Sequence, residues 1–235
     1  MAQVEGANGP STSLLADTWL VVPLYNEAPV VREVIAAARA VFPHIVVVDD
    51  GSTDGSGAEA AAAGAVVVHH PINLGQGAAL QTGITYVLER TDARYLVTFD
   101  ADGQHSPADA AAMVERAEAE GLAIVLGSRF LGGSTDVGWV KRLVLRTAAI
   151  ASSRTSGMHL TDAHNGLRLI RRDAAQRLNL TQNRMAHASQ IIRQLGATGL
   201  PWREQGVHIV YTDYSRAKGQ SLWNSVNILV DLLFS

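Results

Sequence analysis

Short runs of β-branched residues alternate with alanine-rich stretches along the first half of the chain, and this alternation limits the possible folds more than any other feature. It predicts strands over residues 18–23, 45–48, 65–69, 94–99 and 123–127, and helices over residues 30–41, 54–63, 77–90 and 107–120. Strands separated by helices are typical of βαβ units and a mostly parallel sheet. We therefore expect an α/β fold that binds its ligands outside the carboxyl ends of the strands.

The second half of the chain has a less regular pattern. It predicts helices over residues 138–157 and 185–195, and strands over residues 167–170 and 207–211. Residues 221–234 have an amphipathic helical pattern, with Asn224, Asn227 and Asp231 on the polar side. The predicted organisation is a disordered leader at residues 1–17, one α/β domain at residues 18–220 and a C-terminal amphipathic helix at residues 221–235.

Composition excludes several classes of protein. Hydrophobic residues make up 47% of the 235 residues and charged residues 17%, so the chain can bury a large core. A net charge of -3 gives no reason to expect a nucleic-acid partner. The absence of cysteine excludes disulfides and thiolate metal sites and fits a reducing cytosol. No apolar run reaches the length of about 18 residues that a membrane-spanning helix needs, and the N-terminus does not resemble a signal peptide.

Two aspartates, Asp100 and Asp102, follow the predicted strand at residues 94–99. In extended backbone, residues two apart point the same way, so the two carboxylates would converge and repel each other. A solvated turn would explain an isolated pair. Here, polar and acidic stretches also follow the strands at residues 18–23 and 45–48, at the same expected edge of the sheet. A hard divalent cation, Mg²⁺ or Mn²⁺, that also binds substrate phosphates would neutralise the pair.

The polar stretches after the first two strands could contact a nucleotide. They are Tyr25-Asn26-Glu27 and Asp49-Asp50-Gly51-Ser52. Helix capping accounts for the residues after Asp50 but not for the two adjacent aspartates, one of which could accept a hydrogen bond from a base or a ribose. Asn73-Leu74-Gly75-Gln76-Gly77 opens a helix, but it lacks the third glycine of a dinucleotide-binding motif. A plain turn and a phosphate-facing loop both remain open there.

Basic residues occur later in the chain, at Arg129, Arg142, Arg146, Arg216 and Lys218. Each alone is more often a surface residue, but cations opposite an acidic metal site suit a diphosphate leaving group. Arg216 and Lys218 lie in a polar stretch whose composition is typical of loops that close over ligands. The histidines lack metal-ligand spacing, and His105 is the one close to the aspartates in sequence.

These motifs together resemble the family 2 glycosyltransferases, and among them most closely the dolichyl- or polyprenyl-phosphate sugar synthases. The matching motifs occur in the family's order: Val22-Pro23-Leu24-Tyr25-Asn26-Glu27, Val48-Asp49-Asp50-Gly51-Ser52-Thr53-Asp54-Gly55, Asn73-Leu74-Gly75, Asp100-Ala101-Asp102-Gly103-Gln104-His105, Gly127-Ser128-Arg129 and Asn165-Gly166-Leu167-Arg168. The likeness covers most of residues 18–221. It implies the GT-A fold, with a Rossmann-like nucleotide-binding half, and a catalytic domain at residues 18–220.

The resemblance also implies roles for individual residues. The nucleotide pocket would contain Pro23, Tyr25, Glu27, Asp50 and Asp100. Asp100 and Asp102 would hold the divalent metal. Donor or acceptor phosphate would be contacted by Gln104, Arg142, Arg216 and Lys218. Arg129 and Asp162 would be catalytic, with Asp162 near the acceptor.

The implied reaction is inverting, metal-dependent transfer of a sugar from a UDP- or GDP-linked donor to a polyprenyl phosphate or a glycan hydroxyl. Only a hydroxyl acceptor would need Asp162 as a general base. Two departures leave the acceptor open: Asn165-Gly166-Leu167-Arg168 stands for the usual Ser-Gly-Phe/Tyr-Arg, and Gln190 stands where the family often has Glu.

Two other functions fit an acidic site on such a sheet. A sugar-phosphate nucleotidyltransferase would have a Gly-rich basic loop after the first strand, where this chain has Leu24-Tyr25-Asn26-Glu27. A non-catalytic GT-A-like binding module would be expected to lose an aspartate or the late basic stretch, and both are present. We expect a cytoplasmic enzyme. The apolar face of residues 221–234 could contact the cytoplasmic face of the membrane, pack on the domain or form a homodimer.

Overall fold

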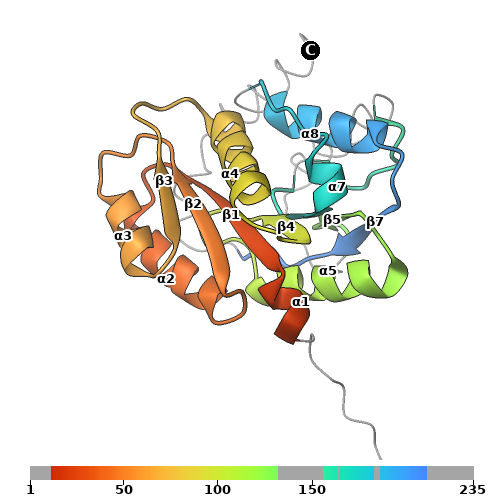
Figure 1. Ribbon diagram of the computed structural model, residues 1–235, viewed down its shortest axis with the longest axis horizontal. Coiled ribbons are helices and arrows are strands. Elements are labelled where there is room, and N and C mark those ends of the chain that lie inside the picture. Colours follow the sequence, from red (N-terminus) through yellow and green to blue (C-terminus); the bar gives the residue numbers. More distant parts are fainter. Residues whose placement is uncertain (1–11, 132–155, 164, 183–185, 211–235) are drawn as a thin grey trace, which may run out of the picture.

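A central sheet organises the protein (Figure 1). The computed structural model describes residues 12–131, 156–163, 165–182 and 186–210, and within them seven strands pair in the order β3-β2-β1-β4-β6-β5-β7. The strands are β1 (Thr18–Leu24), β2 (His44–Asp49), β3 (Val66–His69), β4 (Tyr95–Thr98), β5 (Ile124–Ser128), β6 (Arg168–Arg171) and β7 (Trp202–Gly206). All pairs are parallel except those of β6, which is antiparallel to both β4 and β5. The predicted α/β fold with a mostly parallel sheet is confirmed.

Helices cover both faces of the sheet (Figure 1). One face carries α1 (Thr12–Ala16), α2 (Ala28–Arg39), α3 (Ser56–Ala62) and α5 (Pro107–Glu120). The other face carries α4 (Gln76–Arg90), α7 (Arg172–Ala175) and α8 (Ala186–Ala197). Because side chains on both faces are covered, central strands such as β4 and β5 are buried along their whole length, which explains their mostly apolar sequences. Among the described residues, no helix is long and apolar enough to cross a membrane.

Local signals set the ends of α5. Proline at its first position, Pro107, lacks the N–H that would have no partner in the first turn. The helix stops at Gly121, whose φ of 64° is the left-handed conformation that glycine adopts without strain. The predicted helix at residues 107–120 and the observed helix therefore have the same bounds.

The structure corrects the sequence analysis in three places. Residues 12–16, expected in a disordered leader, form α1 and bury Leu15 in the core. The prediction of a strand at residues 207–211 is wrong. The strand in this region is β7, at Trp202–Gly206, and Ile209 makes only an isolated bridge to His105. The edge strand β7 has the sequence Trp-Arg-Glu-Gln-Gly and is only half-buried, so it lacks an apolar pattern. The short helix α7 was also missed. The helices predicted at 138–157 and 221–234 lie almost wholly or wholly outside the described residues.

Candidate functional site

The loops that follow β1, β2 and β4, together with the segment that leads from β3 into α4, surround a cavity of about 430 Å³. The cavity is lined by Pro23, Leu24, Tyr25, Glu27, Asp50, Asn73, Gly75, Gln76, Ala79, Asp100, Ala101 and Asp102. Every residue predicted for the nucleotide pocket and for the metal is in this set. Gln104 and the predicted Arg129 and Asp162 are not, and Arg142, Arg216 and Lys218 lie outside the described residues.

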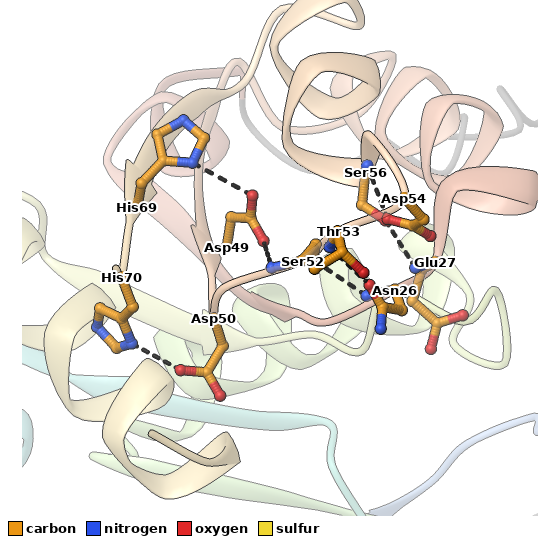
Figure 2. A network of polar contacts seen from close by, with 10 residues as sticks. All are labelled: Asn26, Glu27, Asp49, Asp50, Ser52, Thr53, Asp54, Ser56, His69 and His70. Atoms are coloured by element: carbon orange, nitrogen blue, oxygen red, sulfur yellow. Dashed lines mark hydrogen bonds and ion pairs between the residues drawn. The ribbon is translucent and has the colours of Figure 1, made fainter. Parts of the chain in front are cut away.

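A network of hydrogen bonds fixes the loop after β1 against the loop after β2 (Figure 2). Asn26 has a φ of 54°, and its side chain accepts the N–H of Thr53 at 3.0 Å. The N–H of Glu27 donates to Ser56 Oγ at 2.7 Å, and the N–H of Ala28 donates to Asp54 Oδ2 at 3.0 Å. The neighbouring loop therefore satisfies N–H groups at the start of α2, where the helix itself offers no acceptor. This arrangement holds Tyr25 and Glu27 at the cavity.

The structure explains the adjacent aspartates that helix capping left unexplained. Asp49 accepts the N–H of Ser52 at 3.0 Å and contacts His69 (Figure 2). Asp50 faces the other way and accepts the N–H groups of Leu74 at 2.9 Å and Gly75 at 2.7 Å.

His70 also supports Asp50. Its Nδ1 lies 2.7 Å from Asp50 Oδ1, and its Nε2 lies 2.9 Å from Thr82 Oγ1. Asp50 thus fixes the glycine-rich loop at the N-terminus of α4. His70 has no predicted role, because its contacts join segments that are distant in sequence.

Asp100 and Asp102 have opposite electrostatic environments. Burial opposes ionisation of Asp100, but nearby His105, Arg168 and His187 lower the pKa of Asp100 below its ordinary value. His105 Nε2 lies 2.9 Å from Asp100 Oδ2. Burial, and then the negative charge of Asp100, raise the pKa of Asp102 to about 6.

This carboxylate pair fits a hard divalent cation, because such an ion would remove the repulsion that raises the pKa of Asp102. Within the described part of the chain, no group of three or more His, Asp or Glu side chains is arranged to hold a metal. An ion at Asp100 and Asp102 would therefore take its remaining ligands from the phosphate groups of a bound ligand and from water.

Gly166 makes the site depend on a residue without a side chain. A Cβ atom at this position would lie 2.2 Å from Asp100 Oδ2. The carbonyl of Gly166 accepts a hydrogen bond of 2.5 Å from Thr98 Oγ1, which joins the residues before β6 to the end of β4. The backbone of residue 166 therefore forms one wall around the Asp100 carboxylate.

Arg129, which is partly exposed, forms an ion pair with the buried Asp162 beyond the end of β5. Asp162 is 2% exposed, and its Oδ2 accepts both Arg129 Nε at 2.6 Å and the Arg129 N–H at 3.1 Å. Glu204 of β7 accepts the N–H groups of Thr161 at 2.9 Å and of Asp162 at 3.1 Å. Glu204 is not among the predicted site residues, since nothing in the polar sequence of β7 indicates that this strand packs beside β5.

Arg168 links the two acidic centres electrostatically. It is 3% exposed at the start of β6, and its charge acts on both Asp100 and Asp162. Burial lowers the pKa of Arg168 to about 10, against the opposing effect of the two carboxylates. The guanidinium thus partly balances the acidic residues at the base of the site.

Gln190, where the family often has Glu, has a local structural role. Its Oε1 accepts the N–H groups of Thr181 at 3.0 Å and Gln182 at 2.9 Å, and its Nε2 donates to the carbonyl of Asn179 at 3.2 Å. These contacts tie α8 to the segment that follows α7, and this polar side chain is satisfied within the fold.

Comparison with known proteins places the chain in a family. Residues 19–178 match the model for "Glycosyl transferase family 2". The chain is 32% identical to an uncharacterized protein, MJ1222, of Methanocaldococcus jannaschii, with 92% of this chain and 91% of that protein covered. It is 33% identical to the polyprenol monophosphomannose synthase of Mycolicibacterium smegmatis, with 70% of this chain and 65% of the relative covered.

A solved structure shares the fold. The crystal structure of glucosyl-3-phosphoglycerate synthase from Mycobacterium tuberculosis, in complex with Mn²⁺, UDP and glucosyl-3-phosphoglycerate, superposes with a TM-score of 0.66 at 19% identity, with 98% of this chain and 85% of that chain covered. The protein belongs to glycosyl transferase family 2 and is a glycosyltransferase.

Proposed function

We propose that the protein transfers a sugar, with inversion and with the help of a divalent cation, from a nucleotide sugar to a polyprenyl phosphate. The observation that carries the proposal is the meeting of Tyr25, Asp50, Asp100 and Asp102 in one cavity at the carboxyl ends of parallel strands. An aromatic ring and a carboxylate suit the base of a nucleotide, and a pair of carboxylates suits the cation on its diphosphate.

The donor would lie with its base beside Tyr25, which is 45% exposed, and its diphosphate toward Asp100 and Asp102. Mg²⁺ or Mn²⁺ held by these aspartates would offset the charge that develops on the departing diphosphate. The structure of the Mycobacterium tuberculosis synthase with Mn²⁺ and UDP supports this use of the fold. UDP- and GDP-linked donors both suit such a pocket.

The geometry of Asp162 favours an anionic acceptor. A general base needs an oxygen that can take a proton from the acceptor, whereas Asp162 is buried and its Oδ2 accepts two N–H groups of Arg129. We infer that Asp162 orients Arg129 and that Arg129 contacts the acceptor phosphate. A phosphate monoester is already an anion and needs no base. The name of the Mycolicibacterium smegmatis relative, a polyprenol monophosphomannose synthase, supports this class of acceptor.

In the proposed step, a phosphate oxygen of the acceptor attacks the anomeric carbon from the face opposite the nucleotide. A new carbon–oxygen bond forms while the bond from the anomeric carbon to the diphosphate breaks, and the electron pair leaves with the nucleoside diphosphate. A single displacement of this kind inverts the anomeric configuration.

The proposal is tested with the full chain, a short-chain polyprenyl phosphate and a panel of radiolabelled UDP- and GDP-sugars, each with Mn²⁺, Mg²⁺ or EDTA. We expect lipid-linked sugar from one donor, formed with a divalent cation and absent in EDTA, and a product of inverted configuration by NMR. Transfer to a glycan hydroxyl but not to the lipid phosphate would overturn the acceptor assignment, and full activity in EDTA would overturn the metal.

A further inference from the structure

Glu204 lies on the edge strand β7, away from the residues that line the donor cavity, yet its carboxylate meets the segment that carries Asp162. We propose that Glu204 is a positioning residue that acts through Asp162 to orient the Arg129 guanidinium toward the acceptor phosphate. The proposal deepens the function proposed above and rests on it for the identity of the acceptor.

The contacts of Glu204 concentrate on the backbone of residues 161 and 162. Both carboxylate oxygens lie 2.9 Å from the N–H of Thr161, and Oε1 lies 3.1 Å from the N–H of Asp162. These residues belong to no helix or strand, so no ladder of backbone hydrogen bonds fixes them. A charged acceptor of two adjacent N–H groups is the arrangement that stabilises turns and helix starts.

The position of Glu204 itself is well determined. Its residue pairs with Leu126 in the parallel β5–β7 ladder. Its carbonyl accepts a hydrogen bond of 2.9 Å from Arg116 Nη1 of α5. The carboxylate therefore belongs to a strand that is held on one side by the sheet and on the other by α5. From this fixed position it can hold residues 161 and 162 in place.

Residues 161 and 162 in turn fix the position of Arg129. Asp162 Oδ2 accepts the backbone N–H and Nε of Arg129, at 3.1 Å and 2.6 Å. A second contact, of 2.6 Å between Ser128 Oγ and Thr161 Oγ1, joins the same two segments. Rotation of residues 161 and 162 would move Asp162 away from Nε and change the direction of the guanidinium. Glu204 thus acts on Arg129 without touching it.

Three variants test this chain of contacts. In Glu204→Ala, two N–H groups lose their acceptor, and we expect kcat for transfer to a short-chain polyprenyl phosphate to fall about tenfold or more. Glu204→Gln keeps one acceptor oxygen and should stay within about threefold of the parent. Glu89→Gln, at an exposed position on α4, is the matched charge control and should be unchanged. Binding of UDP or GDP should be equal in all four proteins, because the donor cavity lies elsewhere.

A double variant separates positioning from a general structural effect. If Glu204 acts through Asp162, adding Glu204→Ala to Asp162→Asn should lower kcat no further than Asp162→Asn alone. If the losses in kcat of the two single variants multiply in the double variant, or if Glu204→Ala keeps the kcat of the parent, the inference is overturned. The proposed function is unaffected by either result.

A further readout does not depend on activity. The Nε–H resonance of Arg129, assigned by its loss in Arg129→Lys, should exchange slowly with solvent in the parent and in Glu204→Gln and rapidly in Glu204→Ala. If the parent transfers no sugar to the lipid phosphate but this pattern holds, the proposed function fails and the positioning role stands. If exchange is the same in Glu204→Ala as in the parent, the positioning role fails.

Discussion

Replacing Asp102 with asparagine should stabilise the metal-free protein and remove one ligand of the proposed metal site. Burial and the charge of Asp100 raise the pKa of Asp102 from 3.8 to about 6. A carboxyl group whose pKa is higher in the folded state contributes full stability below its unfolded pKa, and that contribution is lost as the pH rises through the folded value. Above about pH 6, the folded protein therefore holds a charge that the unfolded chain would keep in water, and asparagine removes this penalty.

The size of the gain follows from the same pKa. The difference between 3.8 and about 6 corresponds to at most about 3 kcal/mol, at about 1.4 kcal/mol for each pKa unit. Because Asp102 is partly exposed, we expect about 1–2 kcal/mol at pH 8. The loop should keep its shape, since an asparagine oxygen can still accept the Gln104 N–H, which lies 3.0 Å from Asp102 Oδ1.

Urea unfolding in EDTA at pH 8 and pH 5 measures this effect. The stability gap between Asp102→Asn and the parent should be about half as large at pH 5, where the folded parent is mostly protonated at residue 102. In calorimetric titrations at pH 8, the variant should lose Mn²⁺-dependent nucleotide binding. An equal or lower stability of Asp102→Asn at pH 8, or a gap that does not change with pH, would refute the electrostatic reasoning.

Four further substitutions test other contacts. Gly166→Ala should weaken Mn²⁺-dependent nucleotide binding about tenfold or more with little change in Tm, because the new Cβ displaces Asp100. In Gly83→Ala, the Cβ would lie 2.5 Å from Val21 Cγ1 in the core, so that variant should lower Tm instead. Asp50→Asn places an amide nitrogen against one of two backbone N–H groups, and calorimetry should show a loss of about tenfold in nucleotide affinity. Ser56→Ala removes the acceptor of the Glu27 N–H and should cost about 1 kcal/mol in urea unfolding, with wild-type stability arguing against this cross-loop cap.

The sequence predicted most of the first half of the fold, because strands β1, β2 and β4 are largely buried on both faces and their apolar residues stand out in the sequence. Strand β2, for example, has four consecutive apolar, β-branched residues between His44 and Asp49. Prediction failed at β7, where the edge of the sheet leaves Arg203 exposed and tolerates polar residues. Its ladder with β5 depends on a pairing between residues almost 80 positions apart.

The site was predictable in part for a similar reason. Asp50, Asp100 and Asp102 stand directly after strands, and the carboxyl ends of parallel strands share one edge. Residues that act through another segment, such as His70 on Asp50 or Glu204 on Asp162, carry no signal in the local sequence. Their partners are fixed only when distant segments pack together.

The antiparallel strand β6 has a mechanical consequence. It is paired with β4 on one side and β5 on the other, so the strands that carry the proposed donor site and the proposed acceptor site are joined through one strand. A hinge between the two halves would have to break a ladder of backbone hydrogen bonds. Rearrangement during a catalytic cycle should therefore be confined to the loops, while the separation of Asp100 from Asp162 stays nearly constant whether or not substrates are bound. A rigid spacing of this kind would fix the distance between the proposed donor and acceptor sites. Loops could therefore be exchanged to alter specificity while that distance stays the same.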